Sequence, residues 1–207
     1  MRSSKTRKFD LLKARLGFVC NSRRWLGFLA VVLSKLIFFV LPTHAHASPG
    51  AAATPKVRIA EGGWGSTSMD SLQVVLDAVA KEVGSHFVGR DLGTIEVVAA
   101  GSNPMVLFDK GQNGEYVVQL SARDGRWYQF VYQFGHELCH IYSNYDNKEA
   151  RGDTVVSHNQ WFEESLCEAA ALYTLRKMSK NWESAPPSSE WAAYAPTFRQ
   201  YADLLLG

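Results

Sequence analysis

Apolar residues recur along the chain at two different spacings, which predict helices and strands in a definite order. The first helical pattern begins near Thr67, whose hydroxyl forms with Asp70 a sequence resembling a capping box. It continues with an apolar stripe at positions i, i+3, i+4, i+7 and i+11, made of Leu72, Val75, Leu76, Val79 and Val83. This spacing predicts a helix that buries one face against a sheet.

Four short segments rich in β-branched residues predict the strands of that sheet. They are residues 57–60, 94–99, 105–109 and 116–120. Asn113 and Gly114 lie between the last two segments and supply the positive φ that a tight turn needs. We expect the last three segments to be consecutive strands of one sheet.

Helical spacing returns in the second half of the chain. A helix is expected from Asp124, as its N-cap, to Ser143. A second is expected from Trp161 to Lys180 and a last one within residues 186–207. The second has one apolar face, made of Phe162, Leu166, Ala169, Ala170 and Tyr173. The predicted fold class is α+β, a small mixed sheet of about four strands flanked by an active-site helix and a ligand-bearing helix.

The first 47 residues have the composition of an export signal. A basic opening precedes an apolar run from Trp25 to Pro42, and Ala45-His46-Ala47 supplies a small-x-small cleavage pattern. An uncleaved membrane anchor is the alternative, because the run of 18 residues is near the lower limit for a spanning helix. Residues 48–55 are expected to form a flexible leader, and residues 56–207 one domain in a periplasmic or secreted protein.

Removing residues 1–47 reverses the sign of the net charge. That segment holds nine of the 22 Lys and Arg and one of the 20 Asp and Glu, which leaves a net charge near −6. Such a domain lacks the basic surface needed to follow a phosphate backbone, so nucleic acid is excluded as a partner. Two cysteines remain, Cys139 and Cys167, which could form one disulfide or stay as buried thiols.

Candidate metal ligands lie on the helix that ends at Ser143. His136-Glu137-Leu138-Cys139-His140 is an H-E-x-x-H sequence, and residues i and i+4 of a helix share one face, so both imidazoles can bind one Zn²⁺. A catalytic zinc takes a third protein ligand. Glu164 on the next helix is the expected ligand, with Glu168 one turn later accepting the free ring N–H of a liganding histidine.

Two other residues are rival third ligands. Asp146 stands six residues after His140, and His158 also lies downstream of the motif. Ser143 occupies the position where a chain-turning Gly would accompany a ligand at 146. Gly135 inside the motif helix further indicates close approach of a neighbouring backbone.

With H-E-L-C-H followed by W161-F-E-E-S-L-C-E168, the chain resembles the gluzincin group of zinc metallopeptidases over roughly residues 94–180. The resemblance implies hydrolysis by a zinc-activated water, with Glu137 as general base. Glu163 departs from the group's pattern, where Asn commonly precedes the ligand. The analogy also makes residues 116–120 either an edge that pairs a peptide substrate or an internal strand. The oxyanion-stabilising donor stays open among His158, Tyr142, Tyr145 and Tyr173.

The sequence therefore favours an exported zinc metallopeptidase that binds one Zn²⁺ and acts on a peptide or protein. One alternative is a catalytically silent zinc-binding envelope or interaction domain, and another is a hydrolase of a non-peptide amide. The mature domain is small for the thermolysin-like arrangement, so a partner protein that completes the cleft is a further expectation.

Overall fold

The computed structural model describes residues 53–101, 103–143 and 160–207, all within the unit Ala45–Gly207. The expected signal segment and the first part of the leader lie outside these residues. So do the rival ligands Asp146 and His158 and the candidate donor Tyr145.

Four strands form a mixed sheet, as the sequence predicts. They are β1 (Lys56–Ile59), β2 (Thr94–Ala99), β3 (Met105–Val106) and β4 (Tyr116–Leu120), in the order β1-β2-β4-β3. β2 is parallel to both β1 and β4, and β3 is antiparallel to β4. β4 is therefore an inner strand, so the suggestion that residues 116–120 form a substrate-pairing edge is wrong. Of the two alternatives, the internal strand is correct.

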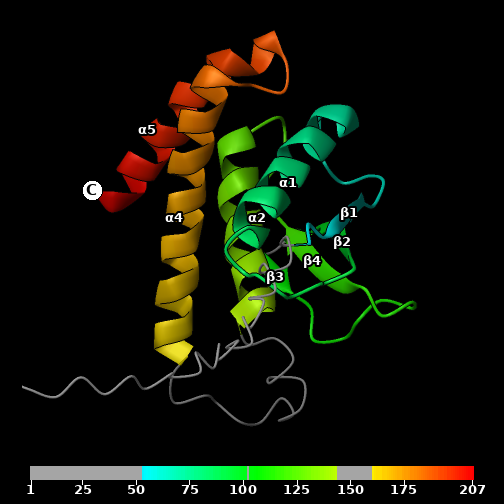
Figure 1. The fold of residues 1–207 in the computed structure, drawn as a ribbon. Coiled ribbons are helices and arrows are strands. Elements are labelled where there is room, and N and C mark those ends of the chain that lie inside the picture. Colours follow the sequence, from blue (N-terminus) through cyan, green and yellow to red (C-terminus); the bar gives the residue numbers. More distant parts are fainter. Residues whose placement is uncertain (1–52, 102, 144–159) are drawn as a thin grey trace, which may run out of the picture. The chain divides into compact units, whose positions relative to one another are not determined.

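The helices form layers on one side of the sheet, which confirms the α+β fold class (Figure 1). α1 (Met69–Gly84) and α2 (Trp127–Ser143) lie next to the strands, and α4 (Gln160–Ser184) packs on both of them. A 3₁₀ helix (Ser189–Tyr194) leads into α5 (Ala195–Leu206), which runs along α4. Within the described ranges, no helix has both the length and the apolar character needed to cross a bilayer.

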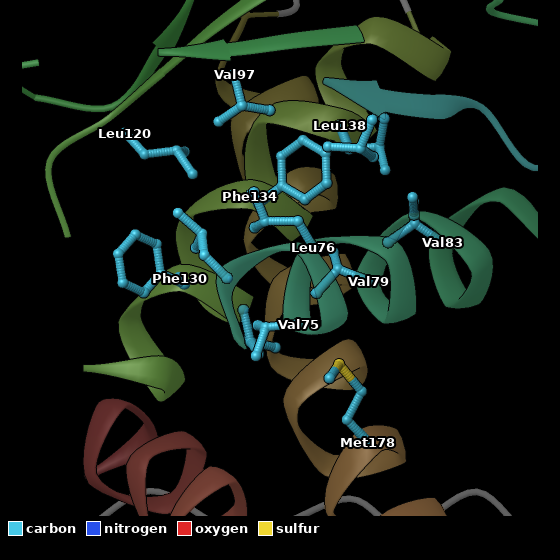
Figure 2. Close-up of a cluster of buried hydrophobic side chains, with 14 of the residues drawn as sticks. Val75, Leu76, Val79, Val83, Val97, Leu120, Phe130, Phe134, Leu138 and Met178 are labelled. Atoms are coloured by element: carbon cyan, nitrogen blue, oxygen red, sulfur yellow. The ribbon is translucent and has the colours of Figure 1, made fainter. Parts of the chain in front are cut away.

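The core lies between the sheet and these helices, as Figure 2 shows. Val97 and Leu120 point from the sheet toward Phe134 and Leu138 of α2, and Leu76 of α1 lies beside them. All five side chains are fully buried. The predicted apolar stripe of α1 is thus confirmed as a core face.

A glutamine fixes the start of α2 against the end of β4. Oε1 of Gln133 accepts hydrogen bonds from the backbone N–H groups of Ser121 and Ala122, both at 3.0 Å. Nε2 of the same side chain donates to Oγ of Ser121 at 3.1 Å. These contacts satisfy the N–H groups of the two residues that follow β4, and they hold in place the helix that carries the histidines.

The N-cap predicted for α1 is wrong by one residue, and α2 begins three residues after its predicted N-cap. The N-cap of α1 is Ser68, whose hydroxyl accepts from the N–H of Ser71, while Thr67 accepts from Gly125 instead. Asp124 has φ 57° and accepts from the N–H of Ser66, and α2 begins only at Trp127. In both cases the side chain bonds to a segment far away in sequence, which local spacing does not reveal.

The predicted buried face of α4 is also wrong. Phe162, Leu166 and Tyr173 are largely exposed, at 58%, 44% and 46%. The face that packs inward begins one residue later in register and consists of Glu163, Cys167, Ala171, Thr174, Leu175, Met178, Ser179 and Trp182. α4 is thus rotated by about one residue, or 100°, from the expected orientation.

Candidate metal centre

α2 and α4 bring His136, His140 and Glu164 together, as the sequence predicts. The Nε2 atoms of the two histidines are 3.1 Å apart, and Oε2 of Glu164 lies 3.4 Å from each of them. Among the described residues these three form the group able to hold a metal ion. The imidazoles share one face of α2 because they are four residues apart.

The spacing of the three atoms suits tetrahedral coordination. Zinc bonds of about 2.1 Å at tetrahedral angles separate neighbouring ligand atoms by about 3.4 Å. The three separations are 3.1, 3.4 and 3.4 Å. Two imidazole nitrogens and one carboxylate oxygen are also donors that zinc prefers. Geometry and chemistry of this group therefore both fit a zinc ion.

Glu163 makes a hydrogen bond with Nδ1 of His140, the ring nitrogen that points away from the cluster. Nδ1 of His140 lies 2.7 Å from Oε1 of Glu163, and both side chains are nearly buried. An ionised carboxylate can only accept, and with Glu163 ionised this contact selects the tautomer that has the proton on Nδ1 and the Nε2 lone pair toward the cluster. The sequence showed Glu163 only as a departure from the gluzincin pattern, although its position beside Glu164 signals a second carboxylate at the site.

Glu168 lies beside the other histidine, but less closely. Its Oε2 is 3.6 Å from Nδ1 of His136, which is beyond hydrogen-bond distance. The same oxygen accepts a hydrogen bond of 2.5 Å from the hydroxyl of Tyr132. Glu168 thus lies beside His136 without the hydrogen bond expected of it, and Tyr132 is a residue that the sequence analysis missed.

Burial favours the neutral form of His136. Burial and the neighbouring His140 both lower its pKa, while Glu164 and Glu168 partly oppose the shift. A neutral imidazole has a lone pair available to a metal. Near neutral pH the imidazole of His136 is therefore in the form that can bind a metal ion.

Glu137 lines the pocket that opens beside the cluster. The pocket has a volume of about 290 Å³ and also contains His136, His140, Gln160 and Glu164. Its apolar lining comes from β3 and its flanks, namely Pro104, Met105, Val106 and Phe108. Glu137 is 7% exposed, so its carboxylate is a buried group at the edge of a cavity. Such a position suits proton transfer to a bound molecule.

The two cysteines lie beside each other in the α2–α4 contact as free, buried thiols. Contact with Cys139 and burial raise the pKa of Cys167. No disulfide joins Cys139 and Cys167 in this structure, so of the two alternatives the structure shows buried thiols.

Two of the candidate oxyanion donors lie away from the pocket. Tyr142 is buried with its ring stacked on Phe87 at 4.4 Å, and Tyr173 packs edge-on against His86. Both rings contact residues that follow α1 and neither lines the pocket, so these two candidates are not placed for the open role. The backbone of α4 does pass beside Gly135, but a Cβ there would lie 3.6 Å from Cα of Ala171, an ordinary van der Waals contact, so this approach leaves room for alanine.

Comparisons with known proteins add no relatives to this description. A scan against protein-family models, a search of curated proteins and a search of solved structures each found no match to this chain.

Proposed function

We propose that this protein is an exported zinc metallopeptidase of the gluzincin kind, with His136, His140 and Glu164 as metal ligands. One observation carries the proposal. Three ligand atoms converge at 3.1 to 3.4 Å, in a pocket that also contains the carboxylate of Glu137. Export rests on the N-terminal sequence alone.

The carboxylates around the two imidazoles support a cation at this point. Nδ1 of His140 lies 2.7 Å from Glu163, and Nδ1 of His136 lies 3.6 Å from Glu168; the tautomer with a proton on each Nδ1 leaves both Nε2 lone pairs facing one another and Glu164. Three electron-rich atoms at this separation repel one another unless a proton or a cation lies between them. A divalent zinc satisfies all three.

The reaction proposed is hydrolysis of a peptide bond. Bound zinc supplies Lewis acidity, which lowers the pKa of a water and polarises a carbonyl. Glu137 takes a proton from the attacking water and later delivers it to the leaving amine. Glu163 and Glu168 orient the ligand imidazoles from outside.

The apolar wall of the pocket favours a substrate with an apolar side chain beside the scissile bond. Met105 and Phe108 line the pocket and are 41% and 49% exposed, so they offer apolar surface to a bound molecule. The metal ligands and Glu137 line the same pocket. Peptides combine the two characters required, an apolar side chain and a polar amide.

A zinc-binding interaction domain without catalysis is the second candidate. It is favoured by the exposed apolar residues along α4, which include Trp161 at 69% and Phe162 at 58%. Large exposed apolar groups commonly mark contact surfaces. A hydrolase of a non-peptide amide would use the same Glu137 chemistry and differ only in its substrate.

Zinc content and turnover of the purified protein test the proposal together. We expect one equivalent of zinc, cleavage of members of a peptide library, and loss of zinc in Glu164→Ala. Glu137→Gln should keep zinc and lose about 10²- to 10⁴-fold in rate. Glu183→Gln is the matched control, because that exposed glutamate lies on α4 away from the cluster.

The outcomes separate the candidates. A folded wild-type protein without zinc would overturn the proposed metal site. A wild-type protein that binds zinc but cleaves no peptide and no other amide would favour the interaction domain. Cleavage of amides other than peptides, again lost in Glu137→Gln, would establish the third function.

A further inference from the structure

The two histidines of the cluster have outer carboxylates in very different surroundings. Glu163, beside His140, has a side chain only 8% exposed and lies at 2.7 Å. Glu168, beside His136, has a side chain 42% exposed and lies at 3.6 Å. Packing therefore fixes Glu163, whereas an exposed glutamate on a helix keeps most of its rotamers unless another group holds it.

Tyr132 is the group that holds Glu168. It precedes His136 by one turn of α2, and its hydroxyl donates to Oε2 of Glu168, the same oxygen that faces Nδ1 of His136. Its ring packs edge-on against Tyr201 of α5 at 6.0 Å, which limits where the hydroxyl can point. Burial and the hydrogen bond to Glu168 raise the pKa of Tyr132, so the hydroxyl stays protonated as a donor.

His136 needs this arrangement because its outer nitrogen is buried. Nδ1 of His136 is a buried atom without a hydrogen-bond partner among the described residues, and Glu168 lies 3.6 Å away. A buried ring N–H without an acceptor is costly, and a small rotation of either side chain would bring the two atoms within hydrogen-bond distance. The side chain of Glu168 must therefore stay near this position.

We propose that Tyr132 is a positioning residue of the metal centre, which holds Glu168 in line with His136 and thereby orients that imidazole toward the metal. Tyr132 thus does for the exposed carboxylate what burial does for Glu163. This inference rests on the metal site proposed above. It adds a chain of contacts that runs from Tyr201 of α5 through Tyr132 and Glu168 to the ligand His136.

Zinc affinity, measured by chelator competition, tests the inference with Tyr132→Phe, Glu168→Ala and the double variant. Loss of an outer carboxylate typically weakens metal binding about 10- to 100-fold, so we expect that loss for Glu168→Ala and about 3- to 10-fold for Tyr132→Phe. The double variant should be no weaker than Glu168→Ala, since the tyrosine acts only through the glutamate. The visible spectrum of the Co²⁺-loaded protein should also shift in Tyr132→Phe.

Tyr128→Phe is the matched control. Tyr128 lies one turn earlier on α2 and its ring packs on the same Tyr201, at 4.7 Å. It should leave zinc affinity and the Co²⁺ spectrum unchanged. Because Phe keeps the ring at both positions, thermal unfolding without metal should be similar for the two variants. Glu168→Ala tests the same chain of contacts without changing the tyrosine.

Three results would overturn the inference. Wild-type affinity and spectrum in Tyr132→Phe would show that the hydroxyl does not position the site, even though the metal site stands. Full additivity with Glu168→Ala would show that Tyr132 acts by another route. A wild-type protein that binds neither Zn²⁺ nor Co²⁺ would overturn this inference and the proposed function together.

Discussion

The two faces of α2 differ in what they bury. One face places Phe130, Phe134 and Leu138, all fully buried, between the sheet and α1. The other faces α4 with His136 and His140, next to three carboxylates. The first face gains free energy by removing apolar surface from water, whereas the second must satisfy every buried polar atom by a partner.

The comparison shows how one helix separates stability from chemistry. The apolar face fixes the position and rotation of α2, and the histidines then point toward α4 as a consequence. The polar face contributes a prepared set of donors and acceptors rather than burial. Changes on the two faces should therefore affect different measurements.

Phe134→Ala should have the largest effect, because it removes a fully buried ring from the core. Such substitutions cost about 3 to 5 kcal/mol in the free energy of unfolding. Denaturant titration of the metal-free protein measures the change. Zinc affinity of the folded fraction should stay within a few-fold of wild type; a specific loss of zinc with unchanged stability would contradict the division between the faces.

Glu163→Ala should show the opposite pattern. Losing the carboxylate behind His140 should weaken zinc binding about 10- to 100-fold, which corresponds to about 1.4 to 2.7 kcal/mol. Chelator competition measures this, with Glu183→Ala as control on the same helix. Unchanged affinity would mean that the contact at 2.7 Å serves only folding.

Glu115 provides a buried carboxylate that is remote from the metal pocket. Hydrogen bonds from the Asn113 side chain, its own backbone N–H and Arg58 lower its pKa to about 2. A depressed pKa gives stability that is present above the ordinary value of 4.5 and is lost as the pH falls toward 2. Glu115→Gln should flatten the decline in unfolding free energy over this range and leave zinc affinity unchanged. An equal decline in both proteins would refute the linkage.

Leu166→Ser should have the smallest effect. This residue is 44% exposed on α4, outside both the core and the cluster. Exposed substitutions usually change stability by less than about 0.5 kcal/mol. Thermal unfolding checks this, with Leu175→Ser on the buried face of α4 as the destabilising comparison. A large loss in Leu166→Ser would mean that the predicted inward face was correct after all.

Local patterns in the sequence determined much of the fold and the centre of the candidate site. The stripe of α1, the strands and the helix that carries the H-E-x-x-H sequence all follow from spacing within a few residues. His136 and His140 share a face for the same reason. Glu164 was expected from its spacing and its gluzincin-like setting, and the structure brings it to the two histidines.

The tertiary structure decided what depends on the rotation of whole helices. α4 carries two stripes at helical spacing, one through Phe162 and Leu166 and one through Glu163 and Cys167, and they are offset by a single residue. Spacing within α4 does not choose between them, because packing on α1, α2 and α5 sets the rotation. That rotation places Glu163 on His140 and brings Glu168 within reach of Tyr132. These contacts arise from the sum of many packing interactions between segments far apart in sequence, which no local pattern records.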